Sequence, residues 1–211
     1  MKLYGNTNNK SFNTLKIRFA LAELGAAYDF VPVDLARGES RTPDFVRINP
    51  HGKVPVLVDG DFALPESDAI LWYRAEKDAD ARLLPRFDGT PATTQARAQI
   101  LRFCALASTA FYPASSDWWN ATNNSDPAKR SPEAADTALV KVKRALDVLE
   151  KTLATGEHLV GEFSLADVTN VSILFALKRR LPIDPLVGHE RARAWYQRVT
   201  ARPAWESVSA D

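Results

Sequence analysis

The sequence predicts an α/β domain with a mixed sheet, followed by an all-α helical bundle domain. Strand-like and helix-like patterns alternate in the first part of the chain, whereas the second part shows only helical periodicity. Between the two parts, residues 79–93 hold two prolines, a glycine and several charges, a composition typical of a linker. We therefore expect domains at residues 1–78 and 94–211.

The first domain begins with a short strand at Leu3 and Tyr4. Apolar residues from position 14 onward follow the period of a buried helix, and Gly25 is a suitable residue to end it. Residues 28–35 alternate in the manner of a strand. Pro32 cannot donate to a sheet ladder, so this strand is expected at an edge of the sheet.

A hairpin and a closing helix complete the first domain. Residues 53–64 form two β-rich runs split by Asp59-Gly60, a strong hairpin signal between alternating hydrophobics. After Pro65, residues 66–77 have a helical pattern with Ser67 near its start. The expected order is strand, helix, strand, loop or helix, strand, strand, helix.

The second domain carries helical periodicity in four segments, at residues 94–112, 132–154, 164–181 and 188–200. The polar, proline-bounded stretch between the first two contains adjacent tryptophans and is expected to separate the helices. Before the third helix, Ser164 and Asp167 form an S-x-x-D capping box, and Phe163 with Val168 can form a hydrophobic staple.

Composition narrows the classes of function. The chain has 211 residues, 45% of them hydrophobic, and a net charge of +1, so neither nucleic acid nor an anionic membrane is an expected partner. No apolar stretch approaches the roughly 20 residues of a membrane span, and no signal-peptide core is recognisable at the start. Cys104 is the single cysteine, which excludes an intrachain disulfide. We expect a cytoplasmic protein.

Several common catalytic motifs are missing from the sequence. It contains no phosphate-binding glycine-rich loop, no G-x-S-x-G and no C-x-x-C. His51, His158 and His189 lie far apart along the chain, and no Cys/His cluster has metal-ligand spacing. We therefore expect neither a metal site nor a bound cofactor.

Residues 48–70 hold the most informative stretch. Pro55 stands at the entry to a strand, which leaves the backbone of Val54 facing outward, where an extended peptide could pair with it. Glu66 and Ser67 lie where a strand turns into a helix, and the free N–H groups of a helix start favour a carboxylate. Each feature alone also fits an ordinary loop, a helix cap or a surface charge.

Together these motifs resemble a known family. "NPHGKVPVL", then "PESDAI" about ten residues later, closely resemble the glutathione-binding half of the cytosolic glutathione S-transferases. "FSLADV" lies where that family carries a capping box in its helical domain. The resemblance spans nearly the whole chain and implies a thioredoxin-like first domain that binds glutathione as a co-substrate.

The resemblance also implies roles for individual residues. The backbone of Val54, ahead of a cis Pro55, would pair with the cysteinyl part of glutathione. Glu66 and Ser67 would hold the γ-glutamyl end, with Ser67 binding its carboxylate.

Two basic residues are expected at the glycyl end of glutathione. Arg41 corresponds to the basic residue that commonly contacts the glycine carboxylate, and Lys53 occupies a position where relatives often place Gln or Lys. Ser40 departs from the family pattern, because several classes have His there.

Glutathione transfer needs a thiolate, since the thiol itself is a poor nucleophile. Aligned backwards from "LKIRFAL", Ser11 falls on the position of the activating residue in the serine-type and bacterial classes. Asn13 and Thr14 are the alternatives, and a chain without a catalytic side chain stays open as a third. Tyr4 lies too early for the tyrosine-type classes, so we expect it to pack in the sheet.

The second domain would line the site for a small hydrophobic electrophile. The candidates are four aromatic residues: Phe111, Tyr112, Trp118 and Trp119. The alternative is that these rings pack the helical core. Trp195, Tyr196 and Trp205 are expected to serve packing, and Cys104 to be a small buried side chain.

The sequence is compatible with three functions. The first is conjugation of glutathione to hydrophobic electrophiles in detoxification. The second is peroxide reduction or dehalogenation with glutathione at the same site, and the third is a glutathione- or ligand-binding protein with little catalysis. Family members are commonly homodimers, so the resemblance also implies a second copy of the chain as a partner.

Overall fold

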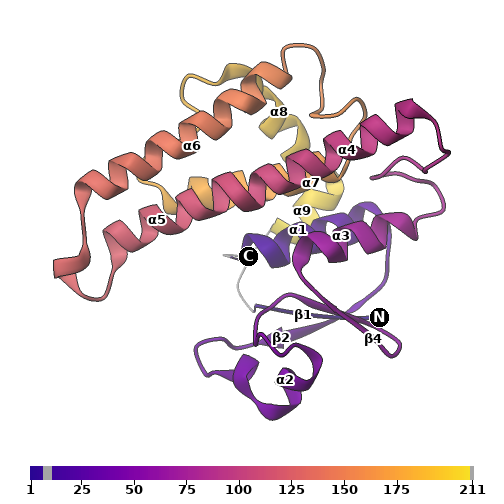
Figure 1. The fold of residues 1–211 in the computed structure, drawn as a ribbon, viewed down its shortest axis with the longest axis horizontal. Coiled ribbons are helices and arrows are strands. Elements are labelled where there is room, and N and C mark those ends of the chain that lie inside the picture. The colour runs from indigo at the N-terminus through magenta and orange to yellow at the C-terminus, as the bar shows by residue number, and fades with distance from the viewer. Residues whose placement is uncertain (7–10, 210–211) are drawn as a thin grey trace. The chain divides into compact units, whose positions relative to one another are not determined.

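The computed structural model describes residues 1–6 and 11–209 and divides into two compact units (Figure 1). The first unit comprises residues 1–88 together with the end of the chain from Ala201, and the second spans Gly89–Thr200. The first unit is built on a mixed sheet and the second is helical, as the sequence predicts.

Within the described residues the strands form one sheet in the order β2-β1-β3-β4. Their bounds are β1 Lys2–Asn6, β2 Asp29–Val33, β3 Val56–Asp59 and β4 Phe62–Pro65. β2 runs parallel to β1, whereas β3 is antiparallel to both β1 and β4. β2 therefore lies at an edge, as Pro32 predicts.

Helices cover both faces of this sheet (Figure 1). α1 (Phe12–Glu23) and α3 (Ser67–Glu76) lie together on one face. The 3₁₀ turn Glu39–Arg41 and α2 (Pro43–Ile48) lie on the other. There Val33, Phe45 and Val56 form a core cluster, and Tyr4 packs against it with its ring 6.1 Å from that of Phe45. The expected packing role of Tyr4 is confirmed.

Local chemistry sets the C-terminal end of α1. Gly25 adopts φ +57°, and its N–H donates to the carbonyl of Ala22 while the N–H of Ala26 donates to that of Leu21. This pair of bonds is a Schellman motif, which confirms Gly25 as the residue that ends the helix.

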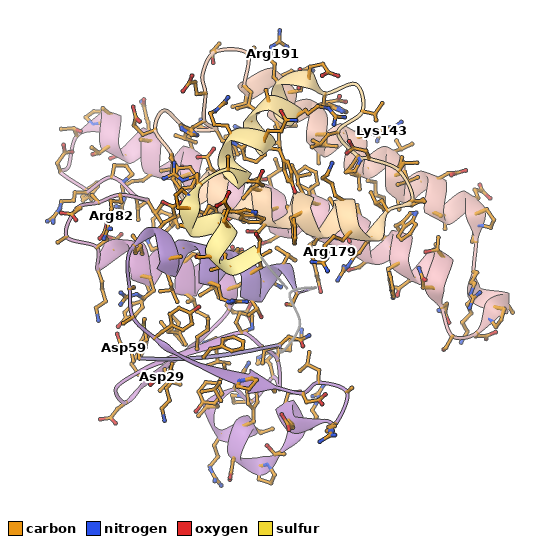
Figure 2. The ribbon with its side chains drawn as sticks, turned by 180° about the vertical axis from the view of Figure 1, so that it is seen from behind. Asp29, Asp59, Arg82, Lys143, Arg179 and Arg191 are labelled. Atoms are coloured by element: carbon orange, nitrogen blue, oxygen red, sulfur yellow. The ribbon has the colours of Figure 1, made fainter. Side chains whose placement is uncertain are left out.

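The hairpin is tied to the last turn of α3 at its β-turn. Asp59, labelled in Figure 2, accepts hydrogen bonds from the side chains of Tyr73 at 2.9 Å and Lys77 at 2.8 Å. Both hydrogen bonds lower the pKa of the Asp59 carboxyl, and the bond from Lys77 has the larger effect. The turn uses Gly60 at φ +63°, in line with the Asp-Gly signal.

The first unit also contains a helix that the sequence patterns do not predict, α9 (Pro203–Ser209). It packs on α1, where the rings of Trp205 and Phe19 meet edge to face at 5.1 Å. Arg202 adds a two-pronged ion pair with Glu23, with N–O distances of 2.6 and 2.8 Å. The packing role expected for Trp205 is confirmed, since it is buried.

The helical unit consists of α4 (Pro91–Leu106), α5 (Tyr112–Asn123), α6 (Pro132–Thr152), α7 (Leu165–Arg180) and α8 (Glu190–Thr200). A π turn, Ala107–Phe111, joins α4 to α5 without a break, and a 3₁₀ turn, Pro127–Lys129, precedes α6.

The segment around the paired tryptophans corrects a prediction. Residues 112–123 are helical, although their polar, proline-bounded sequence favours a break between helices. Pro113 lies in the first turn of α5, directly after the wider π turn. A proline is tolerated there because the N–H that it lacks is not needed for a regular α-helical bond.

The predicted capping box is present at the start of α7. The Ser164 hydroxyl accepts from the N–H of Ala166, and Asp167 accepts from the N–H of Ser164 at 3.0 Å. Asp167 is fully buried and also accepts from the N–H of Leu159 at 3.1 Å and the indole of Trp195 at 2.7 Å. One carboxylate therefore joins the helix start, the preceding loop and α8.

A second carboxylate organises the connection from α7 to α8. Burial would raise the pKa of Asp184, but hydrogen bonds from Lys178, the N–H of Leu186 and Arg193 outweigh it and lower the pKa to about 2. The N–O distances are 2.9 Å to Lys178 and 2.8 Å to Arg193. Tyr196, close by, is a partly buried phenol whose burial raises its pKa to about 12.

Candidate functional site

The sheet register brings the predicted glutathione-site segments to one end of the first unit. Tyr4 pairs with Val56, and Val56 pairs with Pro65. The end of β1, the start of β3 and the end of β4 therefore lie at the same end of the sheet. Val54-Pro55 precedes β3, Glu66-Ser67 follows β4, and the chain from β1 leads into α1.

The start of α1 presents Ser11 as its N-cap. Ser11 has extended backbone angles, and its side chain makes no capping hydrogen bond within the part of the chain that the structure describes. Its hydroxyl is thus not used to cap the helix. Asn9 and Lys10, also in the polar loop, lie outside the described residues.

Thr14 is less suited than Ser11 to activate a thiol. Its side chain is buried, at 3% exposure, and its hydroxyl accepts from the N–H of Asn6 at 3.4 Å. A Cβ on Gly5 would lie 2.6 Å from the methyl group of Thr14, so a glycine is required at that position. Thr14 therefore packs α1 onto β1.

The loop before β3 holds Val54 in a defined geometry. The peptide bond between Val54 and Pro55 is cis, as the family resemblance implies. Asn49 is buried, donates its amide to the carbonyl of Lys53 at 2.7 Å and accepts from the N–H of His51 at 3.1 Å. Sequence reasoning missed Asn49 as a loop-shaping residue, although its Asn-Pro context signals a turn.

Gly52 is required in this loop for two reasons. Its φ is +59°, a left-handed conformation that side chains disfavour. A Cβ there would also lie 2.9 Å from the carbonyl oxygen of Ser40 and 3.1 Å from the guanidinium of Arg41. Arg41 therefore lies against the loop that carries Lys53, and both basic side chains are exposed.

The start of α3 forms the next part of the site. Glu66 has φ 68° and ψ 111°, a strained backbone for a residue other than glycine. Ser67 follows as the first helical residue, where free N–H groups and the helix dipole favour an anion. The Ser67 hydroxyl donates to the side-chain oxygen of Asn13 at 3.0 Å.

That contact joins the two predicted halves of the site. Asn13 belongs to the first turn of α1, and Ser67 to the first turn of α3. A second contact runs beside it, from the ammonium of Lys16 to the carboxylate of Asp68 at 2.6 Å. Sequence reasoning did not single out Lys16, because an isolated lysine in an apolar helix pattern carries no motif.

The four aromatic candidates of the second unit divide into two pairs. Phe111 is fully buried and Trp118 is only 8% exposed, so both belong to the helical core. Tyr112 is 42% exposed and Trp119 is 47% exposed, which leaves their rings accessible within this unit. The guanidinium of Arg180 lies 6.0 Å from the Trp119 ring centroid.

Across residues 1–6 and 11–209, no three His, Cys, Asp or Glu side chains gather in a metal-binding group. None of the helices in those same residues has the length and apolar content to cross a membrane. Cys104 is buried, and its sulfur lies 3.6 Å from the Thr169 hydroxyl.

Comparison with known proteins agrees with this geometry. Residues 1–76 match the family model "Glutathione S-transferase, N-terminal domain", and residues 93–203 match "Glutathione S-transferase, C-terminal domain". The chain is 35% identical to glutathione S-transferase 3 of Zea mays over 215 residues, which cover 100% of this chain and 93% of the relative.

Solved structures are similar over almost the full length. Glutathione transferase URE2P6 from Phanerochaete chrysosporium, solved with oxidized glutathione, has a TM-score of 0.86 at 25% identity, covering 98% of this chain and 93% of that one. Glutathione S-transferase I, bound to lactoylglutathione, has a TM-score of 0.82 at 29% identity, covering 99% and 97%.

Proposed function

Because the chain belongs to the glutathione S-transferase family, we propose that it joins glutathione to small hydrophobic electrophiles. The observation that carries this proposal is the meeting of three segments at one end of the sheet. They are the start of α1, the cis Val54-Pro55 loop and the start of α3. Glutathione is the co-substrate, and the proposed chemistry uses no cofactor.

The tripeptide is proposed to bind across this end of the sheet. Val54 lies two residues outside the paired part of β3, so its backbone is placed to pair with the cysteinyl residue. Glu66 and Ser67 hold the γ-glutamyl end at the start of α3, where the helix dipole attracts its carboxylate. Arg41 and Lys53 supply positive charge at the glycyl end.

Ser11 is proposed to stabilise the thiolate. A free thiol has a pKa of about 8.5, so near neutral pH the protein must favour the anion. A hydroxyl that donates to the sulfur, close to the N-terminus of α1, does so electrostatically. The thiol proton passes to solvent, the sulfur forms a bond to the electrophilic carbon, and the leaving group departs with its electron pair.

The hydrophobic substrate is proposed to contact the second unit through its accessible aromatic rings. Tyr112 and Trp119 expose enough surface for this role. Phe111 and Trp118 support them from the core, because their own surfaces are covered. We further propose that the protein acts as a homodimer in the cytoplasm, in detoxification.

The proposal is tested with Ser11→Ala, and Ser67→Ala is the matched control. Glutathione binding is measured by calorimetry, and thiolate absorbance and conjugation of a chlorodinitroarene are followed against pH. Ser11→Ala should raise the bound thiol's pKa toward about 8.5 and lower kcat by about 10²-fold. Ser67→Ala should weaken binding and leave that pKa unchanged.

Each part of the proposal can fail separately. Wild-type protein that does not bind glutathione contradicts the function. An unchanged pKa and rate in Ser11→Ala would show that Ser11 is not the activator, and Asn13→Ala would then be measured in the same way. Tight binding without conjugation of any electrophile would instead favour a binding protein.

A further inference from the structure

We propose that Lys16 is a positioning residue for the γ-glutamyl end of glutathione, acting through Asp68 on the first turn of α3. This inference rests on the proposed function. It adds a role for a side chain that no sequence motif marks.

Lys16 is buried in an unusual way for a lysine. Its side chain has no exposed surface, and its ammonium lies 2.6 Å from a carboxylate oxygen of Asp68. The same ammonium lies 5.3 Å from the ring centroid of Phe12. A buried ammonium is strongly destabilising unless it is paired, so the geometry of this ion pair constrains both helices.

The ion pair runs beside the contact between Asn13 and Ser67. Asn13 and Lys16 are three residues apart and share one face of α1, while Ser67 and Asp68 are neighbours in α3. The two contacts therefore connect the same turn of α1 to the same turn of α3. Loss of the ion pair would let the Ser67 hydroxyl and the N–H groups of the helix start move away from α1.

The ion pair has an electrostatic effect as well. Asp68 places a negative charge in the turn proposed to receive the γ-glutamyl carboxylate, and its side chain is 35% exposed. Without the Lys16 ammonium beside it, the Asp68 charge would repel that carboxylate. Lys16 cancels this charge, so the positive end of the helix dipole remains available to the ligand.

These two effects predict how the KM for glutathione differs among variants of Lys16 and Asp68. Lys16→Met keeps an unbranched side chain one atom shorter but removes the ammonium that neutralises Asp68. The KM for glutathione should therefore rise about tenfold or more, with a smaller change in kcat. Lys16→Met combined with Asp68→Asn should recover part of this loss, since the repelling charge is gone. Lys16→Arg should retain most of the affinity.

A truncated thiol separates positioning from general damage. Cysteinylglycine lacks the γ-glutamyl group, so Lys16→Met and wild type should use it equally well. Lys77→Met is the matched control, because it removes another α3 ion pair, to Asp59 at 2.8 Å, at the far end of the helix. It should leave the KM for glutathione unchanged.

The experiment measures KM and kcat for both thiols, glutathione binding by calorimetry and thermal unfolding. A lower Tm for Lys16→Met with an unchanged KM for glutathione would overturn the proposal, and so would equal losses with both thiols. If Lys16→Met does not fold, the double variant Lys16→Met/Asp68→Asn carries the test, because it buries no unpaired charge; a KM for glutathione equal to that of wild type would then refute the proposal. Absence of binding by wild type would refute the proposed function instead.

Discussion

Replacement of Asp167 by alanine should strongly destabilise the helical unit. The carboxylate is fully buried and accepts four hydrogen bonds, from the N–H groups of Leu159 and Ser164, the hydroxyl of Ser164 and the indole of Trp195. Hydrogen bonds to a charged group contribute about 1.5–3 kcal/mol each, and alanine would leave three buried N–H donors without this acceptor.

The net loss in the free energy of unfolding is smaller than the sum of the individual hydrogen-bond contributions. Alanine also removes the cost of burying the carboxylate, and the bonds form one network in which losses do not add. We expect Asp167→Ala to lower the free energy of unfolding by about 3–5 kcal/mol. Asp167→Asn, which keeps one oxygen, should cost about 2 kcal/mol, and Ser164→Ala about 1 kcal/mol.

Urea unfolding followed by tryptophan fluorescence measures these differences, and Trp195 reports directly because its indole is one of the donors. Circular dichroism at the same urea concentrations checks whether both probes follow one transition. A loss below about 1 kcal/mol for Asp167→Ala would refute the reasoning, since a single cap accounts for that much.

Two further predictions concern the loop before β3 and the dependence of stability on pH. Gly52→Ala should weaken glutathione binding about tenfold by calorimetry, because its Cβ would meet the carbonyl of Ser40; Gly60→Ala, with a similar φ but open space, should not. Asp184, whose folded pKa of about 2 lies below the ordinary 3.8, stabilises the fold above about pH 4 and loses this effect as pH falls toward 2. Asp184→Asn should therefore lower the free energy of unfolding by about 1–2 kcal/mol at pH 6, after allowance for a side chain that is 31% exposed. The loss should be smaller at pH 3. Urea unfolding at both pH values measures it, and equal losses would contradict this prediction.

Local chemistry was readable from the sequence wherever a few neighbouring residues decide the backbone. The Asp59-Gly60 turn, the helix end at Gly25 and the Ser164 capping box each depend on contacts within about six residues. The same holds for the edge position of the strand with Pro32, because a missing N–H restricts any sheet in the same way.

The polar segment 113–123 shows the limit of such patterns. Its sequence favours a loop, yet it continues the helix before it, because packing on other helices outweighs weak local preference. α9 was missed for a related reason. It is a short helix near residue 205. Its Trp205 and the preceding Arg202 have their partners on α1, about 180 residues earlier.

For the candidate site, the sequence by itself determined which segments carry suitable chemistry: a polar helix start, a proline-bounded strand entry and a strand-to-helix turn. Only the tertiary structure decided that they meet, because the register from Tyr4 through Val56 to Pro65 sets which strand ends lie at the same end of the sheet. It also decided that Lys16 pairs with Asp68, 52 residues away, since that contact depends on which faces of α1 and α3 pack together.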